Sequence, residues 1–191
     1  MQTVLNVAEK PSIAKSLSLH LCENGQPNRI RSHSQYNPVT KFQRGFNGQN
    51  ANVIITSVTG HICGIDFVEG FNNWQRTDPL VLLQDAAIET KHDPKKSGIK
   101  QNLEEQSRVA TDIVLWLDCD REGEAIAYEV LEICQQVNPR IRVHRAWFSA
   151  VTKVDVMNAW NNLRQLNPLL RDAVTLRSEF DLRTGASYTR F

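Results

Sequence analysis

The sequence predicts an α/β fold, in which a mostly parallel, doubly wound sheet is flanked by helices. Short apolar segments rich in β-branched residues alternate with segments whose apolar residues recur at helical spacing. Polar or charged clusters directly follow three of the apolar segments. Since sheets of this kind bind ligands at the carboxyl ends of their strands, these clusters are the first indication of function.

Four apolar segments are predicted to form the sheet. Residues 3–8 and 53–58 are short and β-branched, as is typical of buried strands. Residues 113–117 form the most apolar segment in the chain, and residues 142–148 read as a further strand.

Helices are predicted between these strands. Pro11 suits the first turn of a helix, and residues 12–22 carry apolar side chains at helical spacing. Residues 99–110 predict an amphipathic helix, and the apolar positions of residues 126–134 predict another. The polar residues 25–50 show little periodicity, apart from an Asn-Gly pair that suits a hairpin turn into the next strand.

We expect one domain over residues 1–150 and the start of a second, helical domain over residues 151–191. Thr152 is suited to cap one helix, and Pro168 favours the start of another that runs to about Thr184. The sequence ends without a helix stop signal, so we expect the second domain to be truncated.

The composition indicates a globular protein and argues against several classes. Of 191 residues, 41% are hydrophobic and 23% are charged, which suffices for a core. No apolar run approaches the ~18 residues of a membrane span, and no signal peptide pattern is present, so we expect no membrane partner. Four scattered cysteines without a CxxC pair fit a reducing compartment. Without GxxxxGK[ST] or GxGxxG, we expect neither ATP nor a dinucleotide.

Charge is distributed unevenly along the chain. Residues 1–60 contain six basic and two acidic residues. Residues 61–139 contain seven basic and fifteen acidic residues, and residues 140–191 contain nine basic and four acidic residues. One interpretation is an ordinary solvated surface. The other is a cation site that lies between surfaces attracting a polyanion.

Three carboxylates follow the most apolar strand at alternate positions, Asp118, Asp120 and Glu122. In extended backbone they point to one side, and carboxylates this close repel unless a hard cation such as Mg²⁺ joins them. The alternative is an acidic helix start, which accounts for Glu122 and Glu124 better than for the two aspartates. An EF-hand calcium loop closed by Glu129 is disfavoured, because a strand and not a helix precedes it.

Five segments spread over the whole chain carry recognisable motifs in order. They are Val7-Ala8-Glu9-Lys10-Pro11-Ser12-Ile13-Ala14-Lys15, Thr56-Ser57-Val58-Thr59-Gly60-His61, Trp116-Leu117-Asp118-Cys119-Asp120-Arg121-Glu122-Gly123-Glu124, Arg145-Ala146-Trp147-Phe148-Ser149, and residues 177–191. Together they resemble the Rossmann-like toprim domain of type IA DNA topoisomerases, in the eukaryotic topoisomerase III branch, followed by the beginning of the helical DNA-gate domain.

The resemblance implies an enzyme that transiently cleaves and rejoins single-stranded DNA through a 5′-phosphotyrosine link, allowing relaxation or decatenation without ATP. It implies that Glu9 is the acid/base near the leaving 3′ oxygen and that Lys10 stabilises charge on the phosphate. It also implies a Mg²⁺ site formed by Glu9, Asp118, Asp120 and Glu122.

The resemblance further places Arg177 and Arg183 near the DNA gate, and His61, after Gly60 at a strand end, is a candidate for phosphate contact. Each also has a structural interpretation, His61 as a satisfied strand-end residue and the arginines as parts of a charged helix. Trp74 lies in a polar stretch and is a candidate for stacking on a base. The family's nucleophilic tyrosine lies outside this sequence and Tyr188 is in the wrong motif, so we expect this chain alone to be inactive.

Two alternative functions belong to other classes of protein. Another toprim nucleic-acid enzyme, a primase or nuclease, would share Glu9 and the aspartates but lack the segment from residue 177 onward. A non-catalytic toprim module would bind DNA or a partner protein. By the resemblance we expect single-stranded DNA as the ligand, a nuclear location, and a RecQ-type helicase and an OB-fold cofactor protein as partners.

Overall fold

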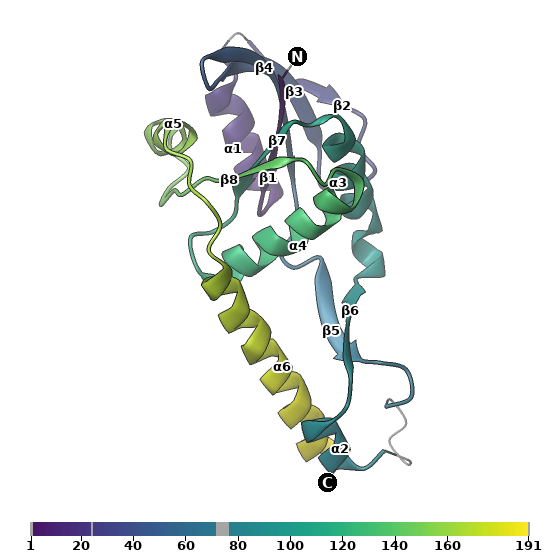
Figure 1. Ribbon diagram of the computed structural model, residues 1–191. Helices are drawn as coiled ribbons and strands as arrows, with labels where there is room; N and C mark the ends of the chain where they lie inside the picture. Colours follow the sequence, from purple (N-terminus) through teal and green to yellow (C-terminus); the bar gives the residue numbers. More distant parts are fainter. Residues whose placement is uncertain (1, 24, 72–76, 191) are drawn as a thin grey trace.

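The computed structural model describes residues 2–23, 25–71 and 77–190, and it has the predicted α/β architecture (Figure 1). Its main sheet has the strand order β2-β3-β4-β1-β7-β8, in which β4, β1, β7 and β8 run parallel and β2 and β3 antiparallel. These strands are β1 (Gln2–Ala8), β2 (Asn28–Ile30), β3 (Val39–Phe46), β4 (Gln49–Ser57), β7 (Asp112–Trp116) and β8 (Arg142–Arg145).

Helices cover both faces of the sheet. Helices α1 (Pro11–Leu21) and α5 (Lys153–Asn161) pack on one face, where Leu17 and Trp160 share a core with strands β1 and β4. Helices α3 (Ser97–Val109) and α4 (Arg121–Val137) pack on the other, where Leu103 contacts the opposite sides of the same strands. Burial on both faces explains why the central strands are continuous apolar runs.

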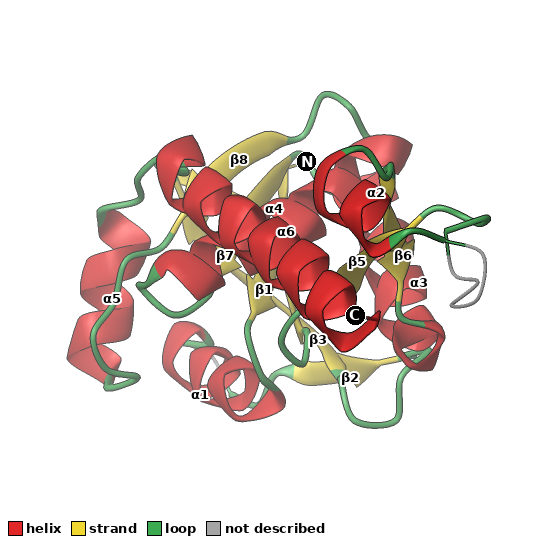
Figure 2. Ribbon diagram, turned by 90° about the horizontal axis from the view of Figure 1, so that it is seen from below, coloured by secondary structure: helices red, strands yellow, loops and turns green. Residues whose placement is uncertain are grey.

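A second part, which we call the arm, extends from the sheet (Figures 1 and 2). It contains the hairpin β5 (Cys63–Phe67) and β6 (Ile88–His92), the short helix α2 (Pro79–Gln84) and the long helix α6 (Pro168–Arg190). A 3₁₀ turn, η1 (Pro94–Lys96), connects β6 to α3. A small separate core of Phe67, Leu82 and Ala86 joins α2 and the hairpin to α6 through Leu182 and Ala186.

The structure confirms the predicted strands and helices of the sheet domain, and it differs from the prediction in several places, among them the short strand β2, which was not predicted. Strand β3 lies within residues 25–50, which were too polar to predict it, because only one of its sides is buried. The hairpin β5–β6 and helix α2 are short and were not predicted. Strand β8 ends at Arg145, which pairs with Arg164. Helix α6 continues past Thr184, since Ser187 Oγ donates to a carbonyl of α2.

The division at residue 150 stays a prediction, because α5 packs beside α1 in the core of the sheet domain whereas α6 leaves it. Trp74 lies outside the described residues. Within residues 2–23, 25–71 and 77–190, helices long and apolar enough to cross a membrane are not found.

At the amino end of the sheet, the buried carboxylate of Asp112 collects hydrogen bonds from four side chains. Arg142 donates twice, at 2.9 and 2.7 Å, and Gln2, Thr111 and His144 contact it at 3.0, 2.7 and 3.0 Å. Burial alone would raise the pKa of Asp112, but the hydrogen bonds from Arg142 and the other donors hold it well below its usual range.

Asp112→Asn is expected to lower the free energy of unfolding at pH 7 by about 2 kcal/mol, because hydrogen bonds to a charged group are lost. A carboxyl group whose pKa is lower in the folded state stabilises that state fully at pH values above its unfolded pKa of about 3.9. This stabilisation is lost as the pH falls through the lower pKa of the folded state. Urea denaturation should therefore show the difference from wild type shrinking below about pH 4. Asp66→Asn, at an exposed pair with Lys91, is the control and should cost less than about 1 kcal/mol. Equal, pH-independent losses in both variants would contradict this account.

Candidate metal centre at the carboxyl end of the sheet

Three predicted site segments meet at one edge of the sheet because the strands that carry them are parallel neighbours. Glu9 follows β1, His61 follows β4, and Asp118 follows β7, with β1 between the other two. The carboxyl ends of these strands lie at the edge from which the arm extends (Figure 1). The fold therefore gathers residues that are more than 100 positions apart in sequence.

Glu9 and the Asp118 loop are in direct contact. The Asp118 backbone N–H donates to Glu9 Oε2 at 2.8 Å, and the Glu9 N–H donates to the Trp116 carbonyl at 3.1 Å. Lys10 Nζ lies 3.8 Å from Asp118 Oδ2, and the Asp118 side chain is 45% exposed. An early and a central acidic segment thus share one site, open to solvent.

Asp120 begins helix α4. Its Oδ1 accepts a hydrogen bond from the Gly123 N–H at 2.7 Å, which makes Asp120 the N-cap, and the helix starts at Arg121. The backbone is therefore helical at Glu122 and not extended, so Glu122 does not follow the side-chain alternation expected for Asp118 and Asp120. It lies on the first turn of α4 and faces His61. The helix-start interpretation therefore holds for Asp120 as well as for Glu122, and the cation site stays a prediction.

His61 bridges two glutamates of α4. Its Nδ1 lies 2.5 Å from Glu129 and its Nε2 lies 3.1 Å from Glu122. The hydrogen bond with Glu129, opposed by burial and reinforced by Glu122, raises the pKa of His61 to about 9. The ring is therefore protonated at neutral pH. Glu129 also accepts hydrogen bonds from the Ile62 and Cys63 N–H groups. Because strand β7, and not a helix, precedes the acidic loop, Glu129 does not close an EF-hand loop.

A buried ion pair, which sequence reasoning missed, supports the acidic loop. Arg145 Nε donates to Glu124 Oε2 at 2.9 Å, and its two Nη groups donate to carbonyls of Leu115, Leu117, Ala146 and Asp118 at 2.8 to 3.1 Å. From the sequence, Glu124 is predicted only as an acidic residue in the first turn of a helix. Its position in the same helical stripe as buried Ala127 and Leu131 was the one available signal.

Gly123 brings helix α4 against the acidic loop. A Cβ added at this position would lie 2.0 Å from the Asp118 carbonyl oxygen, so only glycine permits the approach. The tight contact fixes the backbone of Asp118 against the first turn of α4.

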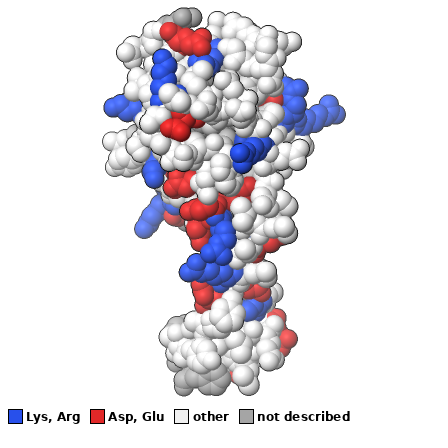
Figure 3. All heavy atoms as spheres, turned by 90° about the vertical axis from the view of Figure 1, so that its left-hand side faces the viewer, with Lys and Arg blue, Asp and Glu red and all other residues white. Residues whose placement is uncertain are grey.

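The two arginines predicted to contact DNA have different surroundings. Arg177 is 71% exposed, lies 3.6 Å from Asp181, and lines a cavity of about 170 Å³ together with Asp120 and Glu122. Arg183 is only 18% exposed, because it pairs with Glu179 and donates to two carbonyls at the end of α2. The structure thus brings Arg177 to the acidic loop and places Arg183 in the arm. Acidic and basic side chains mix where the molecule narrows, whereas the end of the arm is mostly uncharged (Figure 3).

The donor set fits a hard divalent cation. Carboxylate oxygens are the ligands that Mg²⁺ prefers, and it is commonly bound through one or two carboxylates while it keeps waters and takes phosphate oxygens. Exposed Asp118 and Asp120 meet that requirement. In the described ranges, groups of three or more His, Cys, Asp or Glu side chains placed to hold a metal are not found, so the four-carboxylate set of Glu9, Asp118, Asp120 and Glu122 stays a prediction.

Gly123→Ala is expected to lower the free energy of unfolding by about 1–3 kcal/mol, since the new methyl group must displace the Asp118 backbone. Gly185→Ala in helix α6 is the matched control, because a Cβ added at Gly185 would meet nothing within 4 Å. Alanine at this position should raise the free energy of unfolding by about 0.5–1 kcal/mol. Chemical denaturation of the two variants measures both effects. A Gly123→Ala variant as stable as Gly185→Ala would show that the loop does not need the close approach.

Comparisons with known proteins agree with this geometry. Residues 4–151 match the family described as the toprim domain. The chain is 44% identical over 190 residues to DNA topoisomerase 3-alpha of Arabidopsis thaliana, 42% over 187 residues to that of Drosophila melanogaster, and 40% over 191 residues to that of Homo sapiens. These alignments cover 98–100% of the chain but only 15–20% of each relative, so the chain spans about a fifth or less of their length. The chain therefore belongs to the toprim domain family.

Proposed function

We propose that this chain is the metal-binding part of an enzyme that transiently cleaves and rejoins single-stranded DNA through a 5′-phosphotyrosine link. The observation that carries the proposal is the contact of Glu9 with the Asp118 loop, which assembles acid, lysine and paired aspartates at one edge of the sheet. Strand passage during the break would give relaxation or decatenation. In this proposal the nucleophilic tyrosine comes from outside these residues.

Phosphoryl transfer of this kind depends on positioning and on charge placed around the reacting phosphate. The Asp118 N–H holds one oxygen of the Glu9 carboxyl group, which orients it to exchange a proton with the leaving 3′ oxygen. Lys10, beside Asp118, supplies positive charge to the phosphate. A divalent cation held by Asp118 and Asp120, with Glu9 and Glu122 near it, neutralises further charge at the phosphate when bound.

Arg177 supports DNA contact beside this centre. It is exposed and lines the cavity with Asp120 and Glu122, so it can reach a phosphate held there. DNA contact by His61 stays a prediction, because both of its ring nitrogens are already paired with Glu129 and Glu122, which offset its charge. The guanidinium of Arg183 is already engaged with α2 and Glu179, and this favours Arg177 over Arg183 as the phosphate ligand.

Toprim domains bind divalent metals, and we propose Mg²⁺ as the ion for this chain because its donors are carboxylate oxygens. The nuclear location, the RecQ-type helicase and the OB-fold cofactor protein are predictions carried by the family resemblance alone.

A toprim primase or nuclease is the main alternative enzyme. It would share Glu9 and the aspartates but not the segment from residue 177 onward. The relatives named DNA topoisomerase align over 98–100% of this chain, including that segment, and this favours the topoisomerase.

Asp118→Asn with Asp120→Asn is expected to abolish binding of Mg²⁺, because both charged donors are removed while asparagine still caps helix α4. Isothermal titration with MgCl₂, repeated with Mn²⁺ as a spectroscopic probe, measures the loss. The control is Asp78→Asn with Asp93→Asn, which removes two carboxylates that cap other helices and should leave the titration unchanged. Unaltered metal binding in the Asp118/Asp120 variant would overturn the assignment.

The chain is expected to bind single-stranded DNA without sequence preference and with strong salt dependence, since phosphate contacts dominate such affinities. Fluorescence anisotropy with oligo-dT and a mixed-sequence oligonucleotide should give similar affinities. The logarithm of each association constant should fall linearly with the logarithm of salt concentration, by roughly 0.7 per phosphate contacted. An affinity indifferent to salt would count against the proposal.

A further inference from the structure

A groove separate from the carboxylate cluster runs between helix α1 and the β2–β3 segment. It has a volume of about 610 Å³. Ser18 of α1 and Thr40 of β3 are hydrogen-bonded across it at 2.8 Å, and Ile55 of β4 also lines it. The groove is a feature of the sheet domain itself, on the face that carries α1 and α5.

The groove, whose lining is otherwise uncharged, contains two basic side chains. Lys15 of α1 and Arg29 of β2 both line it, and both side chains are exposed. Over the described ranges, neither side chain has an acidic partner at ion-pair distance, and the lining contains neither Asp nor Glu. Two cations with no counter-charge across a shared concavity attract an anion.

The groove also offers a surface for stacking. Tyr36 lines it and is 75% exposed, and Pro27 and Pro38 line it as well. An exposed aromatic ring beside unpaired cations is the combination by which proteins bind single-stranded nucleic acid, with bases on the ring and phosphates on the cations.

One end of the groove reaches the candidate metal centre. Pro11 and Ser12 line it, and they directly follow Glu9 and Lys10 in the chain. The amino end of helix α1 lies at the same point, and its dipole adds partial positive charge there. A strand whose phosphate lies beside Glu9 and Lys10 can therefore continue into the groove along α1.

We propose that this groove is a second binding track for single-stranded DNA, in which Lys15 and Arg29 hold two phosphates and Tyr36 stacks on a base. The inference rests on the proposed function, because it extends the DNA from the reacting phosphate along α1. A single strand fits better than a duplex, since Tyr36 can stack only on bases that are unpaired and turned outward. An acidic peptide would satisfy the cations but would make no use of the ring.

The test combines charge and ring variants of the full chain, measured by anisotropy with a labelled oligo-dT. Lys15→Gln with Arg29→Gln should flatten the salt dependence by roughly 1.4 in slope, at about 0.7 per phosphate. Tyr36→Ala should weaken binding on the order of tenfold, and Tyr36→Phe should retain it because the ring is kept. An oligonucleotide carrying 5-iododeoxyuridine should photo-cross-link to the peptide that contains Tyr36.

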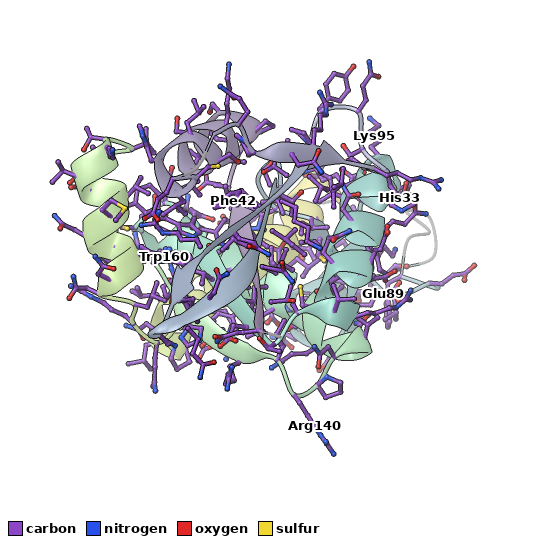
Figure 4. All side chains as sticks on the ribbon, turned by 90° about the horizontal axis from the view of Figure 1, so that it is seen from above. His33, Phe42, Glu89, Lys95, Arg140 and Trp160 are labelled. Atoms are coloured by element: carbon purple, nitrogen blue, oxygen red, sulfur yellow. The ribbon has the colours of Figure 1, made fainter. Side chains whose placement is uncertain are left out.

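The control for charge is Arg140→Gln with Lys153→Gln, which makes the same change at exposed positions elsewhere. Arg140 projects from the lower edge of Figure 4, and neither Arg140 nor Lys153 lines the groove. This variant should keep the wild-type slope. A groove variant that behaves like this control, or a Tyr36→Ala variant that binds as wild type, would overturn the groove assignment.

The outcomes also separate the groove from the proposed function. If wild-type chain binds the oligonucleotide with strong salt dependence but the groove variants do not differ from it, the groove inference fails and the proposed function stands. If wild-type chain shows no salt-dependent binding, both fail. If polyglutamate displaces the oligonucleotide fully at equal charge and Tyr36→Ala has no effect, the groove is a site for acidic polypeptides and the inference is overturned.

Discussion

The guanidinium group of Arg145 holds the site together. It is fully buried, pairs with the equally buried Glu124, and donates to carbonyls from the end of β7 and from Asp118. Removing either partner would strand a charge in the core, which typically costs about 3–5 kcal/mol. The pair supplies more than stability, because the Leu117 and Asp118 carbonyls belong to the loop that carries the acidic residues. The loop is irregular, and a buried donor group gives its backbone the partners that a strand would otherwise provide.

Around this pair, each element restrains the same short loop from a different side. The Glu9 carboxylate accepts the Asp118 N–H, Asp120 caps helix α4, and Gly123 lets that helix approach the Asp118 carbonyl closely. The exposed carboxylates are thus carried on a backbone with little freedom to move. Such preorganisation suits phosphoryl transfer, where the protein contributes mainly by placing charge in advance.

The sequence was sufficient to predict the strand-end site because that site depends on topology. Apolar runs predict parallel strands, and parallel strands bring Glu9, His61 and Asp118 to one edge. The direction of Glu122 was not predictable, since it depends on α4 beginning at Arg121 and on a histidine 61 residues away. The Arg145–Glu124 pair was missed because a charged residue within a motif looks solvated until tertiary packing buries it. Within the arm, α6 was predicted from Pro168, whereas the β5–β6 hairpin and α2 were missed because each of them buries few residues.

The Glu124 carboxylate has a second attachment with a mechanical meaning. Its Oε1 accepts the Asn167 N–H at 2.6 Å, immediately before α6 begins, while its Oε2 stays on Arg145. Swinging α6 about its first turn would break a hydrogen bond to a buried charge, at a cost of about 1.5–3 kcal/mol. The first turn of the long helix is therefore held to the strand-end edge of the sheet through the same buried carboxylate that supports the acidic loop, and hydrogen bonds from Arg183 and Ser187 hold its other end to the α2 segment.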